Sequence, residues 1–304
     1  MKLGDLNAAS LRQRLKHRGI LLRTPPFTSR IRSDSPLVVE GLLRCYAPFE
    51  LAPDDDFADF DLQVSLERHL LHRRSARFWS DGRPAFTALP ANQAFHMIEW
   101  GLNWAITAHA HQFLVFHAAV LERQGRAVVL PAPPGSGKST LTAALCQRGW
   151  RLLSDELALC DTHTGELVGL ARPVNLKNDS IALMKAFAPD ARFTSVVPGT
   201  AKGTLALMAA PADSVARVTQ RARPAWLVLP RYRAGSPAHL APLDKAVAFI
   251  MLAEQSFNYD IHGVAGFEAT AALIDRCDCH EFVYSSLDEA IAVFDHLSQT
   301  GAPA

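Results

Sequence analysis

A glycine loop between a predicted strand and a predicted helix narrows the possible folds of this chain more than any other segment. Residues 132–140 read APPGSGKST, which fits the phosphate-binding pattern GxxxxGK[ST] except that Ala132 replaces the first glycine. The residues before it, RAVVLPA, are typical of a buried strand, and KSTLTAALCQRG after it is typical of a helix that ends at Gly149. This order predicts an α/β domain.

The loop residues have chemical reasons for their types. Gly135 and Gly137 have no Cβ, so backbone N–H groups can curve around phosphate oxygens. The following helix offers further N–H groups and the positive end of its dipole. Lys138 would place a cation against the β- and γ-phosphates, and the Ser139 hydroxyl is a hard oxygen ligand that suits Mg²⁺. We predict a phosphate site formed by Gly135, Ser136, Gly137, Lys138, Ser139 and Thr140.

An acidic pair, Asp155-Glu156, follows Lys138 by seventeen residues. The helix and the next strand, WRLLS, use most of that distance, so the pair is predicted at the carboxyl end of this strand, where ligands bind in open parallel sheets. If this strand neighbours the loop strand, the pair faces the phosphates. One carboxylate can then hold Mg²⁺ while the other accepts a proton from an attacking hydroxyl. The alternative is an acidic turn on the surface.

His117 ends the strand-like run FLVFH, twenty-one residues before Lys138. It could be a hydrogen-bonded core histidine, or it could bond a carboxylate or phosphate and tune the acidic pair. Phosphoryl transfer also needs cations beyond Lys138. Arg172, Lys177 and Lys202 are the candidates, and solvated surface cations are the alternative for each.

The rest of the chain divides at a predicted helix, residues 92–111. Residues 1–111 are predicted to be a smaller β-rich domain with this helix as a link, and SPLVVEGLLRCYAPF within it is predicted to contain a β-run. Residues 112–304 alternate strand and helix patterns, which predicts a three-layer α/β core to about residue 297. Helices are expected at about 243–256, 266–276 and in SLDEAIAVFDHLSQ, with Ser286 as its cap.

Composition excludes several classes of protein. The formal net charge is +1 for 304 residues, so no overall basic field indicates nucleic acid or an anionic membrane. No apolar run is long enough for a membrane span, and the first residues carry no secretory core. Five cysteines do not predict a disulfide framework. A cytoplasmic location is therefore expected.

His117, GSGKS at 135–139 and RLLSDE at 151–156 together resemble the catalytic domain of the HPr serine kinase/phosphorylase family, more narrowly its HPr-kinase-related group. In that family a histidine precedes the phosphate loop and an acidic pair follows on the next strand. The resemblance covers about residues 113–297. It departs from the family pattern at Glu156, where a second aspartate is usual. The residues ARPVNLK stand roughly where the family's glycine-rich signature would be, so phosphorylase activity is not expected.

The resemblance implies a phosphate-loop fold related to phosphoenolpyruvate carboxykinases, with ATP and Mg²⁺ as cofactors. It implies that Lys138 binds ATP phosphates, that Ser139 and Glu156 lie at the metal together with Asp155, and that Asp155 is the general base beside His117. The expected activity is transfer of the γ-phosphate to a serine or threonine hydroxyl of a protein or peptide. Relatives form rings, so self-association is expected. A kinase for a small hydroxylated molecule and a non-catalytic nucleotide-binding scaffold remain the alternatives.

Overall fold

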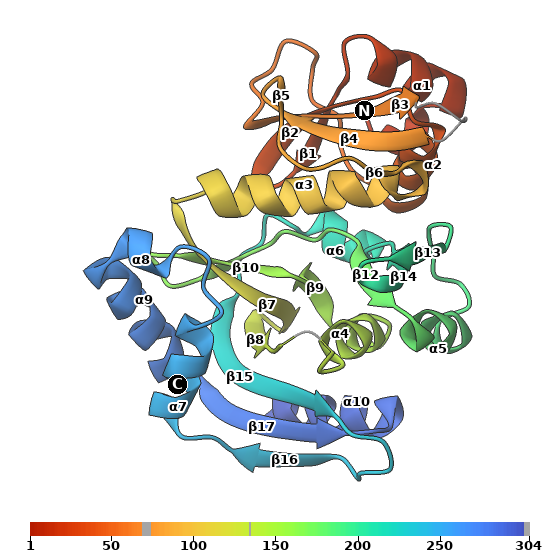
Figure 1. Ribbon diagram of the computed structural model, residues 1–304. Helices are drawn as coiled ribbons and strands as arrows, with labels where there is room; N and C mark the ends of the chain where they lie inside the picture. The colour runs from red at the N-terminus through yellow and green to blue at the C-terminus, as the bar shows by residue number, and fades with distance from the viewer. Residues whose placement is uncertain (69–73, 134, 301–304) are drawn as a thin grey trace. The chain divides into compact units, whose positions relative to one another are not determined.

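The computed structural model describes residues 1–68, 74–133 and 135–300 and shows a mixed α/β protein with several sheets (Figure 1). Two compact units can be distinguished. The first contains residues 1–110, 175–181 and 190–216, and the second contains residues 111–174, 182–189 and 217–304. Two later segments are thus grouped with the N-terminal residues rather than with the rest of the predicted domain 112–304.

The first unit is built on a sheet in the order β1-β2-β3-β4-β5, with β6 paired to β4. Residues of β2, β3 and β4 alternate between buried and less buried positions, as expected for strands with one covered face. Helix α3 packs on β3 and β4, and α1 packs on β2. The elements are α1 (Ala8–Lys16), β1 (Ile20–Thr24), β2 (Phe27–Ser33), α2 (Pro36–Cys45), β3 (Phe60–Arg68), β4 (Arg74–Ser80), β5 (Arg83–Pro84), β6 (Leu89–Pro90) and α3 (Ala94–His109).

Two predictions for this unit can be compared with the structure. The helix predicted at 92–111 is confirmed as α3, which a short 3₁₀ turn at Ala91–Gln93 precedes. The β-run predicted in SPLVVEGLLRC is wrong, because these residues form α2. Pro36 stands at the first helical position, and Val38, Leu42 and Cys45 recur at helical spacing on its buried side.

A small three-stranded sheet and two helices complete the part of the chain between residues 174 and 216. Its strand order is β12-β14-β13. Helix α5 is divided between the two units. The elements are β12 (Val174–Lys177), α5 (Asp179–Phe187), β13 (Val197–Thr200), β14 (Gly203–Met208) and α6 (Ala212–Ala216).

The second unit has one large mixed sheet in the order β11-β10-β7-β8-β15-β17-β16, with β9 also paired to β7. Strands β8, β15 and β17 are parallel, whereas β7 runs antiparallel to β8, β9 and β10. The predicted open parallel arrangement is therefore wrong around β7. The strands are β7 (Phe113–Arg123), β8 (Arg126–Pro131), β9 (Arg151–Ser154), β10 (Leu157–Asp161), β11 (Leu167–Val168), β15 (Arg223–Tyr232), β16 (His239–Pro242) and β17 (Asp278–Tyr284).

Helices cover both faces of this sheet. Alternate residues of β7 join Leu252 of α7 and Leu273 of α9 in one apolar core. On the other face, the ring of Trp150 packs on Trp226 and on Phe294 of α10, and α10 also contacts α4. The predicted helices in the C-terminal part are confirmed. They are α4 (Lys138–Cys146), α7 (Lys245–Ala253), α9 (Val264–Asp275) and α10 (Leu287–Thr300), and a short further helix, α8 (Tyr259–His262), was not predicted.

Candidate functional site

The glycine loop joins β8 to α4, in the predicted context of strand, loop and helix. Gly135 and Gly137 have φ angles of 87° and 90°, the left-handed region that favours glycine. A Cβ on Gly137 would lie 2.5 Å from Tyr284 Oη and 2.9 Å from Tyr232 Cβ. Gly137 is therefore required both for its backbone conformation and for the close approach of the two tyrosines.

Two hydrogen bonds hold the loop carbonyls against the ends of β15 and β17. The Tyr284 hydroxyl donates to Gly137 O over 3.0 Å, and the Tyr232 N–H donates to Ser136 O over 2.8 Å. In a trans peptide the N–H points opposite to the C=O, so the N–H groups of Gly137 and Lys138 are turned away from the tyrosines. Amides oriented in this way, at the start of a helix, suit a phosphate anion.

The two tyrosines were missed in the sequence, although they share a register position, Tyr232 opposite Tyr284, on β15, the parallel neighbour of β8, and on β17, the next strand of the sheet. The only sequence signal was that each ends a strand-like run. Burial, and to a smaller extent Tyr232, raises the pKa of the Tyr284 hydroxyl above its usual range. Tyr284 therefore stays protonated and can donate its hydrogen bond at neutral pH.

The register of β7 brings three parts of the predicted site to one stretch of strand. Pro131, the last residue of β8, pairs with Ala118. On the other edge of β7, Ser154 of β9 pairs with Val120 and Leu157 of β10 pairs with His117. The acidic pair 155–156 forms the bend between these last two pairings. The glycine loop and the acidic pair thus both adjoin residues 117–120 of β7, the segment that begins with His117. Strand β7 lies between the loop strand and the strand of the acidic pair.

The two acidic side chains differ in burial. Asp155 is buried and Glu156 is half-buried. Burial, and to a smaller extent the Asp155 charge, raises the pKa of the thiol of Cys146, the last residue of α4. The predicted strand WRLLS is confirmed by β9, and the acidic pair leads directly into a second strand, β10.

His117 lies on the sheet face opposite the α7–α9 core, because Phe116 and Ala118 on either side belong to that core. Its Nδ1 lies 3.3 Å from Gln255 Oε1, and its backbone N–H donates to Gln255 O over 2.7 Å. With the amide oxygen as acceptor, Nδ1 carries the ring proton and Nε2 is the accepting nitrogen. Its ring also packs on Phe257, with centroids 6.1 Å apart.

Asn258, in the segment AEQSFNY, has a structural role. Its side chain accepts from Val115 N–H over 2.9 Å and donates to Phe113 O over 2.8 Å. These two bonds attach the chain after α7 to the first residues of β7. They fix the position of Gln255 and therefore that of His117.

The predicted cations fall in different parts of the chain. Lys138 is the first residue of α4 and is buried. Arg172 is buried in the same unit and follows Leu170, whose N–H donates to Leu153 O of β9 over 2.7 Å. Lys177 and Lys202 belong to the other unit. The Lys202 ammonium lies 5.4 Å from the centre of the Trp100 ring. Roles in charge stabilisation stay predictions for Arg172, Lys177 and Lys202.

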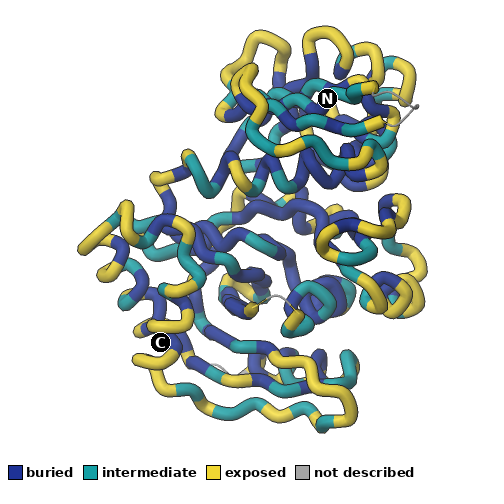
Figure 2. The backbone as a smooth tube through the Cα atoms, in the orientation of Figure 1, coloured by how far each residue is buried: buried dark blue, intermediate teal, exposed yellow. Residues whose placement is uncertain are grey.

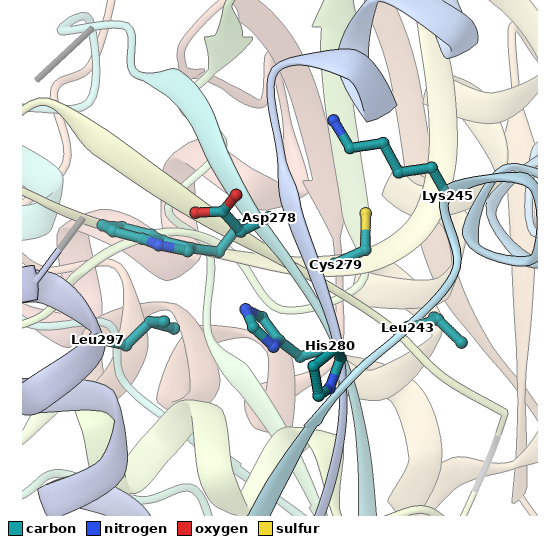
Figure 3. A pocket seen from close by; sticks show the side chains of 8 residues that line it. Leu243, Lys245, Asp278, Cys279, His280 and Leu297 are labelled. Atoms are coloured by element: carbon teal, nitrogen blue, oxygen red, sulfur yellow. The ribbon is translucent and has the colours of Figure 1, made fainter. Parts of the chain in front are cut away.

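A separate cavity of about 370 Å³ lies toward the opposite ends of strands β15 and β17 of the same sheet (Figure 3). Trp226 and Asp278 pair near the beginnings of β15 and β17, whereas the tyrosines that hold the glycine loop are at the ends of these strands. The cavity is therefore distinct from the predicted phosphate site. Its lining consists of Trp226, Pro242, Leu243, Lys245, Asp278, Cys279, His280 and Leu297.

Within the described residues, no group of three or more His, Cys, Asp or Glu side chains is arranged to hold a metal ion. The donors offered near the glycine loop are of another kind, one hydroxyl from Ser139 and the carboxylates of Asp155 and Glu156. Such hard oxygen donors fit Mg²⁺ when phosphate oxygens complete its coordination. None of the helices in the described ranges has both the length and the apolar character needed to cross a membrane.

Comparison with known proteins gives distant similarity to solved structures. Neither a family model nor a curated protein matches the chain. Among solved structures, the HPr(Ser) kinase/phosphatase from Coxiella burnetii matches with a TM-score of 0.28 and 12% sequence identity, over 62% of this chain and 99% of that chain. The chain therefore shows distant structural similarity to an HPr kinase.

Proposed function

We propose that this chain is an ATP- and Mg²⁺-dependent kinase that transfers the γ-phosphate to a serine or threonine hydroxyl of a protein or peptide. The observation that carries the proposal is the register of β7. Its residues 117–120 adjoin the end of the loop strand on one edge and the bend with Asp155 and Glu156 on the other. In-line phosphoryl transfer requires a bound phosphate and a carboxylate close together, and here β7 separates the end of the loop strand from the bend with the acidic pair.

The residues present suit the phosphates and the cation. The left-handed glycines and the tyrosine-held carbonyls leave a loop whose N–H groups can face an anion. Lys138 would neutralise the β- and γ-phosphates, and Arg172 is a further buried cation of this unit. Ser139 and Glu156 are the proposed Mg²⁺ ligands, with Asp155 beside the metal. When bound, the metal would offset charge on the phosphate oxygens.

In the proposed reaction, Asp155 accepts the proton of the acceptor hydroxyl. That oxygen forms a bond to the γ-phosphorus as the bond from phosphorus to the bridging oxygen breaks, and ADP leaves. His117, on the strand beside Asp155, is proposed as a positioning residue, and Gln255 fixes the His117 ring. None of these steps gives a residue a role in removing the phosphate from the product by phosphorolysis. Phosphorylase activity is therefore not part of the proposal.

The test is transfer of label from γ-labelled ATP to a degenerate peptide library centred on serine. Lys138→Ala should abolish detectable ATP binding, whereas Asp155→Asn should keep ATP binding and lower label transfer by about 100-fold or more, the usual contribution of a general base. Glu281→Gln, an exposed change on β17, is the matched control and should keep full transfer.

Three outcomes separate the alternatives. Transfer that survives both changes at Lys138 and Asp155 would exclude the proposed site. ATP binding by the unaltered chain without transfer to any peptide, but with transfer in a screen of hydroxylated metabolites, would identify a small-molecule kinase. ATP binding without transfer to either would leave a nucleotide-binding scaffold.

A further inference from the structure

Large apolar side chains are exposed together on α7, on α8, on the segment between them and on α9. Six of them are between 45% and 75% exposed, and they are Val247, Ile250, Phe257, Ile261, Val264 and Phe267. We call these residues the α7–α9 surface. Figure 2 shows exposed positions along these helices. Single exposed apolar residues are ordinary, but several within twenty-one residues of chain indicate an interaction surface.

These side chains are not turned toward the core of their own unit. Ala248 and Leu252 of α7 belong to the buried apolar core of the sheet. Val247, Ile250 and Glu254 are spaced at i, i+3 and i+7, which places them together on another face of α7. The rings of Phe249 and Phe267 are 5.2 Å apart, so α9 contacts α7 beside the side of α7 that packs on the core. Helix α7 is thus apolar on two faces, as a helix covered on both sides would be.

The charges around the α7–α9 surface define the kind of partner. Between residues 245 and 268 the chain has three acidic residues and one lysine. The acidic residues, Glu254, Asp260 and Glu268, are all exposed. The Lys245 ammonium donates to Asp275 O over 2.7 Å, at the far end of α9. A partner that fits has an apolar segment flanked by lysine or arginine.

The same charges disfavour the other occupants. A second copy of the chain, docked face to face, would bring acidic residues against acidic residues. An anionic membrane surface would also be repelled, because its headgroups have the same sign of charge. A protein segment with basic flanks is therefore the occupant that the chemistry selects.

One residue of the α7–α9 surface, Phe257, contacts the candidate site. Phe257 packs its ring on His117, and Gln255, two residues earlier, accepts from the His117 N–H. We infer that the α7–α9 surface docks the phosphate-accepting protein through an apolar segment with basic flanks, which places its hydroxyl toward the bend at Asp155. This inference rests on the proposed kinase function for the identity of the partner as the acceptor.

The experiment uses the full chain and two labelled amphipathic peptides of equal length and equal apolar content, each with a serine. One has lysine and arginine flanks, and the other has glutamate flanks. Fluorescence anisotropy without nucleotide should show binding of the basic peptide at least tenfold tighter than binding of the acidic one. Ile250→Glu and Phe267→Glu should each weaken it at least tenfold. Val196→Glu, at an exposed apolar position in the other unit, should change it less than twofold.

Charge reversal gives a second measurement that does not depend on the apolar variants. Glu254→Lys combined with Glu268→Lys should reverse the preference toward the acidic peptide. In the transfer assay with γ-labelled ATP, Ile250→Glu should raise KM for the basic peptide at least tenfold with little change in kcat, because the surface binds the acceptor but does not touch the transferred phosphate.

Several results would overturn the inference. Equal affinity for the two peptides, or unchanged peptide binding by both Ile250→Glu and Phe267→Glu, would contradict docking of a basic segment. Dimers that disappear in Ile250→Glu would indicate a second copy as the occupant. Sedimentation with phosphatidylserine vesicles in preference to peptide binding would indicate a membrane. A change in KM no larger than for Val196→Glu would also contradict it. Failure of the kinase proposal is seen separately, as absence of ATP binding or transfer by the unaltered chain, while the anisotropy measurement contains no nucleotide.

Discussion

The hydroxyl of Tyr284, at the end of β17, donates a hydrogen bond to the carbonyl oxygen of Gly137 over 3.0 Å. This bond fixes one peptide plane of the glycine loop from a strand that is distant in sequence. The Tyr232 N–H does the same for Ser136, but through the backbone. The two anchors can therefore be separated by mutation, because a side-chain change removes the first and leaves the second.

Tyr284→Phe should weaken ATP binding by about tenfold, which corresponds to about 1.4 kcal/mol. It should also destabilise the fold by roughly 1–3 kcal/mol, because Gly137 O loses its buried donor. Tyr232→Phe is the matched control, since its hydrogen bond comes from the main chain. Calorimetric titration with ATP and urea unfolding measure the two effects. Equal affinities for ATP in the two variants would show that the Tyr284 bond does not shape the loop.

Gly137→Ala should abolish ATP binding and destabilise the fold by more than the roughly 1–2 kcal/mol that left-handed backbone costs a residue with a Cβ. The excess arises because the new Cβ would meet Tyr284 Oη at 2.5 Å. Gly149→Ala separates the two causes: Gly149 has a φ of 88°, and a Cβ added there would meet no atom within 4 Å. If both variants unfold at the same urea concentration, the close contact at Gly137 has no energetic weight.

The buried ion pair between Glu122 of β7 and Arg151 of β9 should be costly to break. The two residues face each other in the β7–β9 register, and both side chains are almost fully buried. Glu122→Gln should destabilise the fold by about 3–5 kcal/mol, because it leaves Arg151 charged without its carboxylate. Asp54→Asn, which breaks the exposed pair with Arg18, should cost about 1 kcal/mol or less. Similar losses from both variants in urea unfolding would contradict this account.

His96 predicts how stability depends on pH. It is buried in α3, and desolvation lowers its pKa to about 4, below the usual value of 6.5. The unfolded chain therefore binds the proton more tightly, and stability should fall as pH decreases from about 6.5 to about 4. The slope from this group is at most about 1.4 kcal/mol per pH unit.

Urea unfolding at a series of pH values tests the contribution of His96. His96→Leu should flatten the curve in this window, whereas His111→Gln, at an exposed position, should not. An unchanged slope in His96→Leu would show that other groups cause the loss of stability in acid.

Local patterns in the sequence were sufficient for the loop, α4, the two strands around the acidic pair and the C-terminal helices. Glycine, proline and apolar spacing act within a few residues, so they can be recognised without knowledge of the rest of the chain. The prediction for residues 36–45 was wrong, because valine and leucine runs suit both strands and helices and tertiary packing chose the helix.

Relationships between distant segments could not be predicted in the same way. The position of β7 between β8 and β9 depends on strand pairing, which no local pattern records. The positions of Tyr232 and Tyr284 also depend on strand pairing, that of β15 with β8 and with β17. So does the bond from Gln255 to His117, since residues 255–257 adjoin the beginning of β7. The residue types of the candidate site were therefore accessible from the sequence, but the side chains that hold them in place were not.

The tyrosine anchor at residue 284 has a consequence for the order of assembly during synthesis. Residues 132–140 leave the ribosome long before β17 does, so the nascent loop lacks one of its supports until nearly the whole chain has emerged. Nucleotide binding should then begin only after β17 has been synthesised. A chain stalled before residue 284 would display the complete glycine motif and still hold nucleotide poorly.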